Sequence, residues 1–248
     1  MHREPCHQIK SVLIMSSILD NLQAVHAQIN AAARSAARDP RAIDLLAVSK
    51  TFGADAVIEA AQAGQHAFGE NYLQEALDKM AAVRLAQPDL LLEWHFIGPI
   101  QSNKTGPIAE HFDWVHSLAR EKVAQRLAEQ RPAHLPPLNV CLQVNISGEA
   151  SKSGVAPDQL AALAQAVAGM PRLTLRGLMA IPDQSETFEL QRGPFRQLRQ
   201  LFDALRAQGM ALDTLSMGMS ADMNAAIAEG ATIVRVGTAI FGKRDYAQ

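Results

Sequence analysis

Short apolar runs alternate regularly with segments of helical periodicity along this chain, and this alternation limits the folds open to it. The runs that we predict to be strands are Leu45–Ser49, His66–Gly69, Glu93–Ile97, Trp114–Ser117, Leu138–Val144, Thr174–Met179, Thr214–Met217 and Thr232–Val236. Strands that alternate with helices indicate βαβ units and a parallel sheet. Because eight such units fall within one domain length, the pattern favours a closed (β/α)₈ barrel of the TIM type; an open, doubly wound α/β sheet is the alternative.

Helical patterns fill the gaps between these runs. The predicted helices are Ala54–Ala63, Tyr72–Leu85, Lys104–Glu110, Arg120–Glu129, Phe195–Ala207, Ala221–Glu229 and one with Pro157 in its first turn. An extra N-terminal helix precedes the first strand, because Ser17 and Asp20 have the spacing of a capping box. We expect the Asp39-Pro40 pair to end that helix, since the residue before a proline avoids the helical conformation.

Length and composition are those of one globular domain. The chain has 248 residues, of which 48% are hydrophobic and 19% charged, and this balance suits a single barrel with a large core. The capping box at Ser17 and Asp20, which marks the start of the N-terminal helix, lies just after Met15. We therefore expect residues 1–14 to be a disordered extension and residues 15–248 to form the single domain.

Charge and cysteine content exclude several classes of protein. The net charge is −2 and no basic stripe is present, which argues against nucleic-acid binding. No apolar run is long enough to span a bilayer, so we expect no membrane association. The two cysteines, Cys6 and Cys141, form no CxxC pair, which disfavours a disulfide scaffold or a structural zinc site. A reducing, cytoplasmic compartment fits this content.

Functional residues of such a barrel gather where its strands end, and a lysine stands at the end of the first strand. Lys50 follows the run Leu45–Ser49. Near an apolar barrel mouth, desolvation favours the neutral amine, which can attack a carbonyl and form an imine. A lysine that extends to solvent is the alternative, and this residue taken alone favours that alternative.

The loops after the seventh and eighth strands are rich in glycine and hydroxyl residues. Ser220 stands at the start of a predicted helix, Gly237 lets backbone N–H groups approach an anion, and Thr238 adds a hydroxyl donor. Ordinary tight turns are the alternative interpretation. Because barrel phosphate sites are often built from these two loops, the pair predicts a phosphate site.

Arg235 is the most informative single residue, because it lies inside the apolar stretch Ile233–Val236, where a charge needs a partner. One interpretation is a structural ion pair with a barrel carboxylate. The other is a donor to a ring nitrogen of a bound cofactor. Since arginine does not readily lose its proton, it would keep a pyridine nitrogen unprotonated and weaken the ring as an electron sink.

Other polar residues leave more than one interpretation open. Asn71 can bind a cofactor ring or its hydroxyl, or cap the helix that follows. His95 can act as a base or ring contact, or be a satisfied core histidine, whereas we interpret His111 and His116 as structural. Lys152 can meet an anion, although a solvated lysine is the default interpretation.

With these motifs in this order, the chain resembles the pyridoxal phosphate homeostasis protein family. The matching stretches are LLAVSKT (45–51), FGENYLQE (68–75), WHFIGPIQSNK (94–104), VNISGEASKSG (144–154), RGLMAIP (176–182), LSMGMSADMNAAIAEGAT (215–232) and VRVGTAIFG (234–242). The resemblance implies a barrel like the N-terminal domain of alanine racemase, with pyridoxal 5'-phosphate (PLP) bound to Lys50 as an internal aldimine. The chain departs from the family at Phe52-Gly53, where a further lysine and a proline are common, so no second lysine stands beside Lys50.

The same resemblance assigns roles to the residues singled out above. Arg235 is implied to face the pyridine nitrogen, and the two glycine-rich loops are implied to hold the phosphate. The predicted cofactor-binding residues are Lys50, Asn71, Ser216, Met219, Ser220, Arg235, Gly237 and Thr238.

The resemblance implies a carrier or buffer of PLP rather than an enzyme with robust turnover. Racemisation needs acid and base groups on both faces of the substrate carbon, and we find no convincing partner for Lys50. The chain ends six residues after Gly242, so we expect no second catalytic domain and a monomer. A PLP-dependent racemase or decarboxylase of weak activity is the alternative; a Schiff-base aldolase would leave Arg235 unexplained. The expected partners are PLP and apo-PLP enzymes that receive it.

Overall fold

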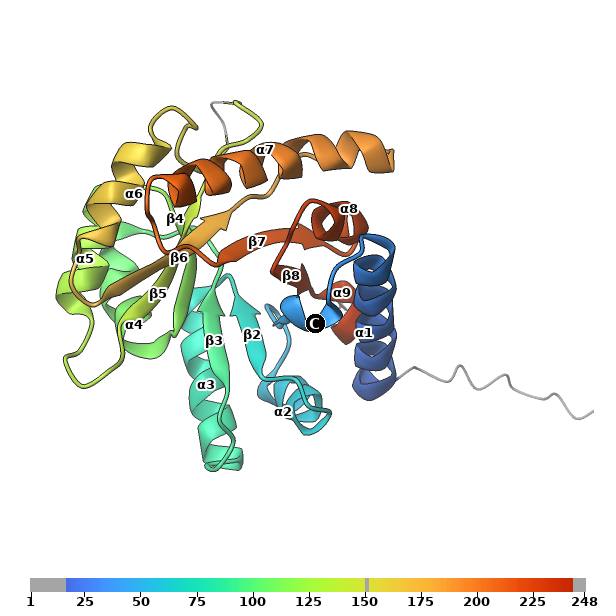
Figure 1. Ribbon diagram of the computed structural model, residues 1–248. Helices are drawn as coiled ribbons and strands as arrows, with labels where there is room; N and C mark the ends of the chain where they lie inside the picture. Colours follow the sequence, from blue (N-terminus) through green and yellow to red (C-terminus); the bar gives the residue numbers. More distant parts are fainter. Residues whose placement is uncertain (1–16, 150–151, 243–248) are drawn as a thin grey trace, which may run out of the picture.

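The computed structural model describes residues 17–149 and 152–242, so the prediction for residues 1–14 lies outside the described residues. Eight parallel strands close into one barrel in the order β1 to β8, as predicted (Figure 1). The strands are β1 Asp44–Val48, β2 Ala67–Glu70, β3 Glu93–Phe96, β4 Trp114–Leu118, β5 Leu138–Gln143, β6 Leu173–Met179, β7 Thr214–Met219 and β8 Ile233–Val236. Each lies within two residues of its predicted bounds, because a buried strand is marked by its apolar run.

Helices follow the strands and surround the barrel (Figure 1). The α-helices are α1 Ile18–Ser35, α2 Ala54–Gln62, α3 Leu73–Ala86, α4 Thr105–His111, α5 Glu121–Gln130, α6 Leu160–Ala168, α7 Phe188–Ala207, α8 Met223–Ala228 and α9 Thr238–Phe241. Two short 3₁₀ helices, η1 Pro40–Ala42 and η2 Ser102–Lys104, precede β1 and α4. Within the described residues, no helix has the length and apolar character needed to cross a membrane.

The N-terminal helix begins as predicted but ends earlier. Ser17 and Asp20 form both hydrogen bonds of the capping box. The helix stops at Ser35, and Ala37 then adopts a positive φ of 52°. The Asp39 side chain accepts a hydrogen bond from Arg41 N and caps η1 instead of ending α1. The prediction that Asp39-Pro40 ends the helix was therefore wrong, because the chain reverses before it reaches the proline.

Helix α7 begins seven residues earlier than the predicted Phe195. Thr187 caps its start by accepting a hydrogen bond from Leu190 N, and Pro194 lies inside the helix. The first turns are largely exposed and extend past the barrel (Figure 1). Pro194 costs one hydrogen bond but does not stop a helix that is already capped upstream.

Other helix starts also differ from the predictions. Helix α6 begins at Leu160, so Pro157 lies in the turn before it. Helix α8 begins at Met223 rather than Ala221, and the four-residue α9 was not predicted. These short segments carry too few residues for a periodic pattern to be recognised.

Helix α1, near the N-terminus, packs beside α8 and α9, the last two helices of the described chain (Figure 1). Asn21 Nδ2 donates to Ile240 O at 2.8 Å, and Arg38 Nη1 donates to Ile227 O at 2.8 Å and Ala231 O at 2.7 Å. The helix buries Leu22, Val25, Ile29 and Ala33 in the core. These contacts hold the loops that follow β7 and β8 in place.

Candidate functional site

A cavity of about 370 Å³ lies at the carboxyl ends of the strands, where function is expected in this fold. Seven of the eight predicted binding residues line it: Lys50, Asn71, Met219, Ser220, Arg235, Gly237 and Thr238. The eighth, Ser216, is fully buried and does not line the cavity, but its hydroxyl accepts a hydrogen bond from Arg235. Residues from both ends of the chain thus meet in one cavity, because β1 and β8 are neighbours in the closed barrel. The pairing of Leu46 with Arg235 sets their register.

The backbone on both sides of Lys50 is held by a cluster that we name the Lys79 cluster, formed by Glu70, Glu75 and Lys79. On the N-terminal side of Lys50, Ser49 O accepts a hydrogen bond from Lys79 Nζ at 2.7 Å. On its C-terminal side, Thr51 N donates to Glu75 Oε1 at 2.5 Å. Thr51 has a φ of 68°, which a β-branched residue adopts only under strain. The cluster therefore fixes the direction in which Lys50 leaves β1.

The Lys79 cluster contains a buried ion pair. Lys79 Nζ lies 2.6 Å from Glu70 Oε1, and the two side chains are 3% and 0% exposed. Burial raises the pKa of Glu70 above its ordinary value, although the charge and hydrogen bond of Lys79 partly oppose this increase. The sequence analysis did not identify this pair. The sequence gives one indication that Lys79 is paired: Glu75 and Lys79 lie four residues apart on α3 and therefore share a helix face.

Asn71 follows β2 and does not cap α3. The N-cap of that helix is Tyr72, which makes no side-chain cap hydrogen bond, so the capping alternative for Asn71 was wrong. Its Oδ1 atom is buried and has no hydrogen-bond partner within the described residues. A buried amide oxygen without a partner is costly unless a ligand or water supplies a donor.

Gly98 leaves room for the Asn71 backbone, and we expect a Gly98→Ala substitution to distort this part of the site. An added Cβ would lie 2.1 Å from Asn71 O and 2.8 Å from Asn71 C, so the main chain would have to move. We expect the free energy of unfolding to fall by about 1–3 kcal/mol, measured by urea denaturation. Gly53→Ala is the control, because no atom lies within 4 Å of the added Cβ there. Equal stabilities of the two variants would contradict the packing argument.

Arg235 is buried, with 4% of its surface exposed, and its hydrogen bonds go to neutral oxygens. Nη1 donates to Ser216 O at 2.7 Å and Ser216 Oγ at 2.8 Å, and Nη2 donates to Ala180 O at 3.0 Å. Burial lowers the pKa of Arg235 to about 10, so the side chain stays charged at neutral pH. Among the described residues no carboxylate lies within ion-pair distance, so the structural ion pair is not formed. A guanidinium has more N–H donors than these three bonds use.

The two glycine-rich loops lie side by side at the same cavity. Ser220 lies in the turn before α8 rather than at its start, because Asp222 is the N-cap and accepts from Met219 N at 2.6 Å. Gly237 precedes α9, and a Cβ there would lie 3.0 Å from Val48 O. Ser220 and Thr238 are exposed at the cavity, so their hydroxyls can donate to an anion.

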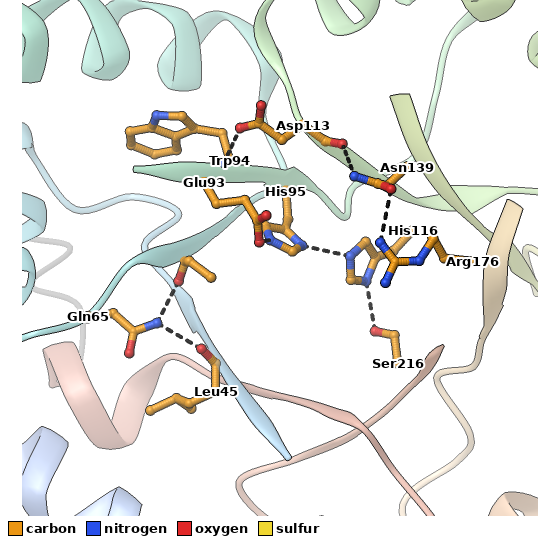
Figure 2. A network of polar contacts seen from close by, with 11 residues as sticks. Leu45, Gln65, Glu93, Trp94, His95, Asp113, His116, Asn139, Arg176 and Ser216 are labelled. Carbon is orange, nitrogen blue, oxygen red and sulfur yellow. Dashed lines mark hydrogen bonds and ion pairs between the residues drawn. The ribbon is translucent and has the colours of Figure 1, made fainter. Parts of the chain in front are cut away.

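His95 and His116 are turned into the barrel rather than toward this cavity. His95 Nδ1 lies 2.9 Å from His116 Nε2, and His95 Nε2 lies 2.7 Å from Glu93 Oε1. Figure 2 shows the two imidazoles side by side, with Ser216 on the far side of His116. His95 is thus a satisfied core histidine. The contact between His116 and Ser216 escaped the sequence analysis, because 100 residues separate them.

Two other polar residues considered in the sequence analysis, Lys152 and His111, lie outside the cavity. Lys152 Nζ forms an ion pair with Asp183 and contacts Ser147 Oγ, outside the cavity that Lys50 lines. His111 pairs with Glu110 on the surface. The described residues hold no group of three or more His, Cys, Asp or Glu side chains that could bind a metal ion.

Comparisons with known proteins relate most of the chain to one family. Residues 21–245 match the family model described as alanine racemase, N-terminal domain. The chain is 62% identical to a pyridoxal phosphate homeostasis protein of Pseudomonas aeruginosa, over 94% of this chain and 98% of that protein. It is 55% identical to the protein of the same name in Vibrio cholerae, over 94% and 99% of the two chains.

A solved structure extends the comparison. PipY of Synechococcus elongatus, crystallised with PLP bound, is 36% identical and superimposes with a TM-score of 0.79. The match covers 91% of this chain and all of that one. On these grounds the chain belongs to the pyridoxal phosphate homeostasis protein family, whose barrel is that of the alanine racemase N-terminal domain.

Proposed function

We propose that the protein binds PLP through a Schiff base (internal aldimine) on Lys50 and carries or buffers it without robust turnover. The observation that carries this proposal is the meeting of three kinds of group in one cavity. Lys50 brings an amine, Ser220 and Thr238 bring hydroxyl donors, and Arg235 brings a buried cation. When bound, PLP supplies an aldehyde that condenses with primary amines.

The residues present fit such a ligand. The Oδ1 atom of Asn71 has no hydrogen-bond partner among the described residues, which leaves an amide at the cavity available to a polar group. Ser220 and Thr238 follow β7 and β8, the two strands whose loops often hold phosphate in this fold. The names of the relatives and the PLP in the PipY structure support the same cofactor.

Arg235 favours storage over turnover. Because its guanidinium remains protonated, it can donate to a pyridine nitrogen but cannot give that nitrogen a proton. An unprotonated ring is a weaker electron sink for carbanion chemistry. The proposed recipients of the cofactor are apo-PLP enzymes, reached by exchange of the lysine amine for another amine.

One experiment tests both binding and carriage. The protein is loaded with PLP, and half of it is treated with borohydride, which makes the link irreversible. Peptide mass mapping of the reduced half should place the adduct on Lys50. The untreated half should reconstitute an apo-PLP enzyme faster than an equal amount of free PLP, and the reduced half should not. An adduct on another lysine would overturn the proposed anchor, and reconstitution no faster than with free PLP would overturn carriage.

A further inference from the structure

A continuous chain of hydrogen bonds runs from the cavity through the barrel interior to the amino end of β3. Arg235 Nη1 lies 2.8 Å from Ser216 Oγ, and Ser216 Oγ lies 2.8 Å from His116 Nδ1. The chain continues from His116 Nε2 to His95 Nδ1 at 2.9 Å and from His95 Nε2 to Glu93 Oε1 at 2.7 Å. Figure 2 shows the part from Ser216 to Glu93.

The two ends of this chain determine the direction of every bond in it. A guanidinium only donates, so Ser216 Oγ accepts from Arg235, and its own hydrogen goes to His116 Nδ1. His116 must then carry its proton on Nε2 and donate to His95 Nδ1. His95 in turn carries its proton on Nε2 and donates to the Glu93 carboxylate, which only accepts.

Burial and charge agree with this direction. His116 is fully buried, and this burial holds its pKa well below the usual range, so the ring is neutral. The hydrogen bond from His95 lowers the pKa of Glu93, so that carboxyl is ionised. In the reverse direction Ser216 Oγ would receive two donors. Its own hydrogen would then lack an acceptor, because His116 and Arg235 are its hydrogen-bond partners within the described ranges.

We propose that Ser216, His116, His95 and Glu93 are positioning residues for Arg235, and that their one-way chain holds both histidines as Nε2–H tautomers. The chain turns the Nη1 edge of the guanidinium toward β7 and so fixes how Arg235 meets a ligand in the cavity. This role rests on the proposed function, because PLP is the ligand whose ring Arg235 would contact.

The first test is nitrogen-15 NMR of the histidine rings in the full-length protein without PLP. The shifts distinguish a protonated from a bare ring nitrogen. We expect His95 and His116, assigned by single His→Gln variants, to show a bare Nδ1 and a protonated Nε2. An Nδ1–H tautomer at either ring would overturn the chain, whatever the outcome of PLP binding. A protein with the expected tautomers that fails to bind PLP would overturn the proposed function alone.

The second test breaks the chain at two places. Ser216→Ala should release His116 into a mixture of tautomers, weaken PLP binding about tenfold and shift the absorbance of bound PLP. Cys141→Ala is the matched control, because it removes a similarly small, fully buried side chain from the strands but lies outside the chain of hydrogen bonds. It should leave tautomers and affinity unchanged. Ser216→Thr, which keeps the hydroxyl, should restore the wild-type tautomers.

Glu93→Gln is the variant that disturbs the core least, because the Glu93 side chain is 49% exposed. Removing the terminal carboxylate should raise the minor Nδ1–H population of His116 as well as that of His95. A purely local role for Glu93 would leave His116 unchanged. Wild-type tautomers at His116 in both Ser216→Ala and Glu93→Gln would overturn the positioning role.

Discussion

Replacing Lys50 by alanine is expected to abolish the adduct that borohydride traps on this protein in the presence of PLP. Lys50 supplies the amine at the cavity that also contains Arg235, Ser220 and Thr238. Without that amine, PLP is held only by its polar contacts. We expect the dissociation constant to rise by at least about tenfold and the imine absorbance to disappear. Spectroscopic titration and mass mapping of the reduced protein measure both effects.

Lys104→Ala is the control for this experiment, because Lys104 is exposed and lies outside the cavity. That variant should retain the adduct, the absorbance and the affinity of the wild type. A Lys50→Ala protein that still forms a reducible adduct in equal yield would show that another amine carries the cofactor. If the wild-type protein itself forms no imine with added PLP, the loops after β7 and β8 would have to be interpreted as a site for a different phosphate ligand.

Replacing Lys79 by methionine is expected to cause a large loss of stability. The substitution removes one partner of a buried ion pair and leaves the Glu70 carboxyl uncompensated. Breaking such a pair costs about 3–5 kcal/mol in the free energy of unfolding, which exceeds the loss expected for Gly98→Ala. It also removes the donor to Ser49 O beside Lys50, so PLP loading should fall as well. Urea denaturation and PLP titration measure the two effects.

Two further variants separate the ion pair from simple packing. In a Glu70→Met, Lys79→Met double variant no fully buried charge is left alone, because the remaining Glu75 side chain is 35% exposed. Apolar replacement of a buried pair is often neutral, so most of the stability should return. Arg41→Met removes one partner of a surface pair in which the Arg41 side chain is 90% exposed, and it should leave stability unchanged. If the double variant were as unstable as Lys79→Met alone, packing rather than charge would explain the loss.

Lys50 and Lys79 act on the same short segment of the chain. Lys50 leaves β1 between Ser49 and Thr51, whose backbone atoms are the ones that the Lys79 cluster binds. Stability and cofactor loading should therefore fall together when the cluster is broken. Loading alone should fall when Lys50 is replaced, because the buried ion pair and the hydrogen bonds to Ser49 and Thr51 remain in that variant.

The barrel and most of the cavity could be predicted from the amino-acid sequence. Apolar runs such as Leu138–Val144 marked the strands, because a strand buried on both faces needs an apolar side chain at nearly every position. In a parallel barrel all strands end at the same face. Lys50, Asn71 and Arg235, which lie at the ends of three strands, were therefore predicted to meet, and the cavity they line contains all three.

The contacts that hold these residues in place depend on the folded barrel. Pro194 signals a helix break in the sequence, yet α7 runs through it because Thr187 caps the helix upstream. The hydroxyl of Ser216 and the ring of His116 come together only when the barrel closes, across 100 residues of chain. A periodic pattern records which face of an element is buried, but not which polar group on another element it meets. For that reason, the sequence predicts the cavity, and only the folded barrel shows how Arg235 is held in it.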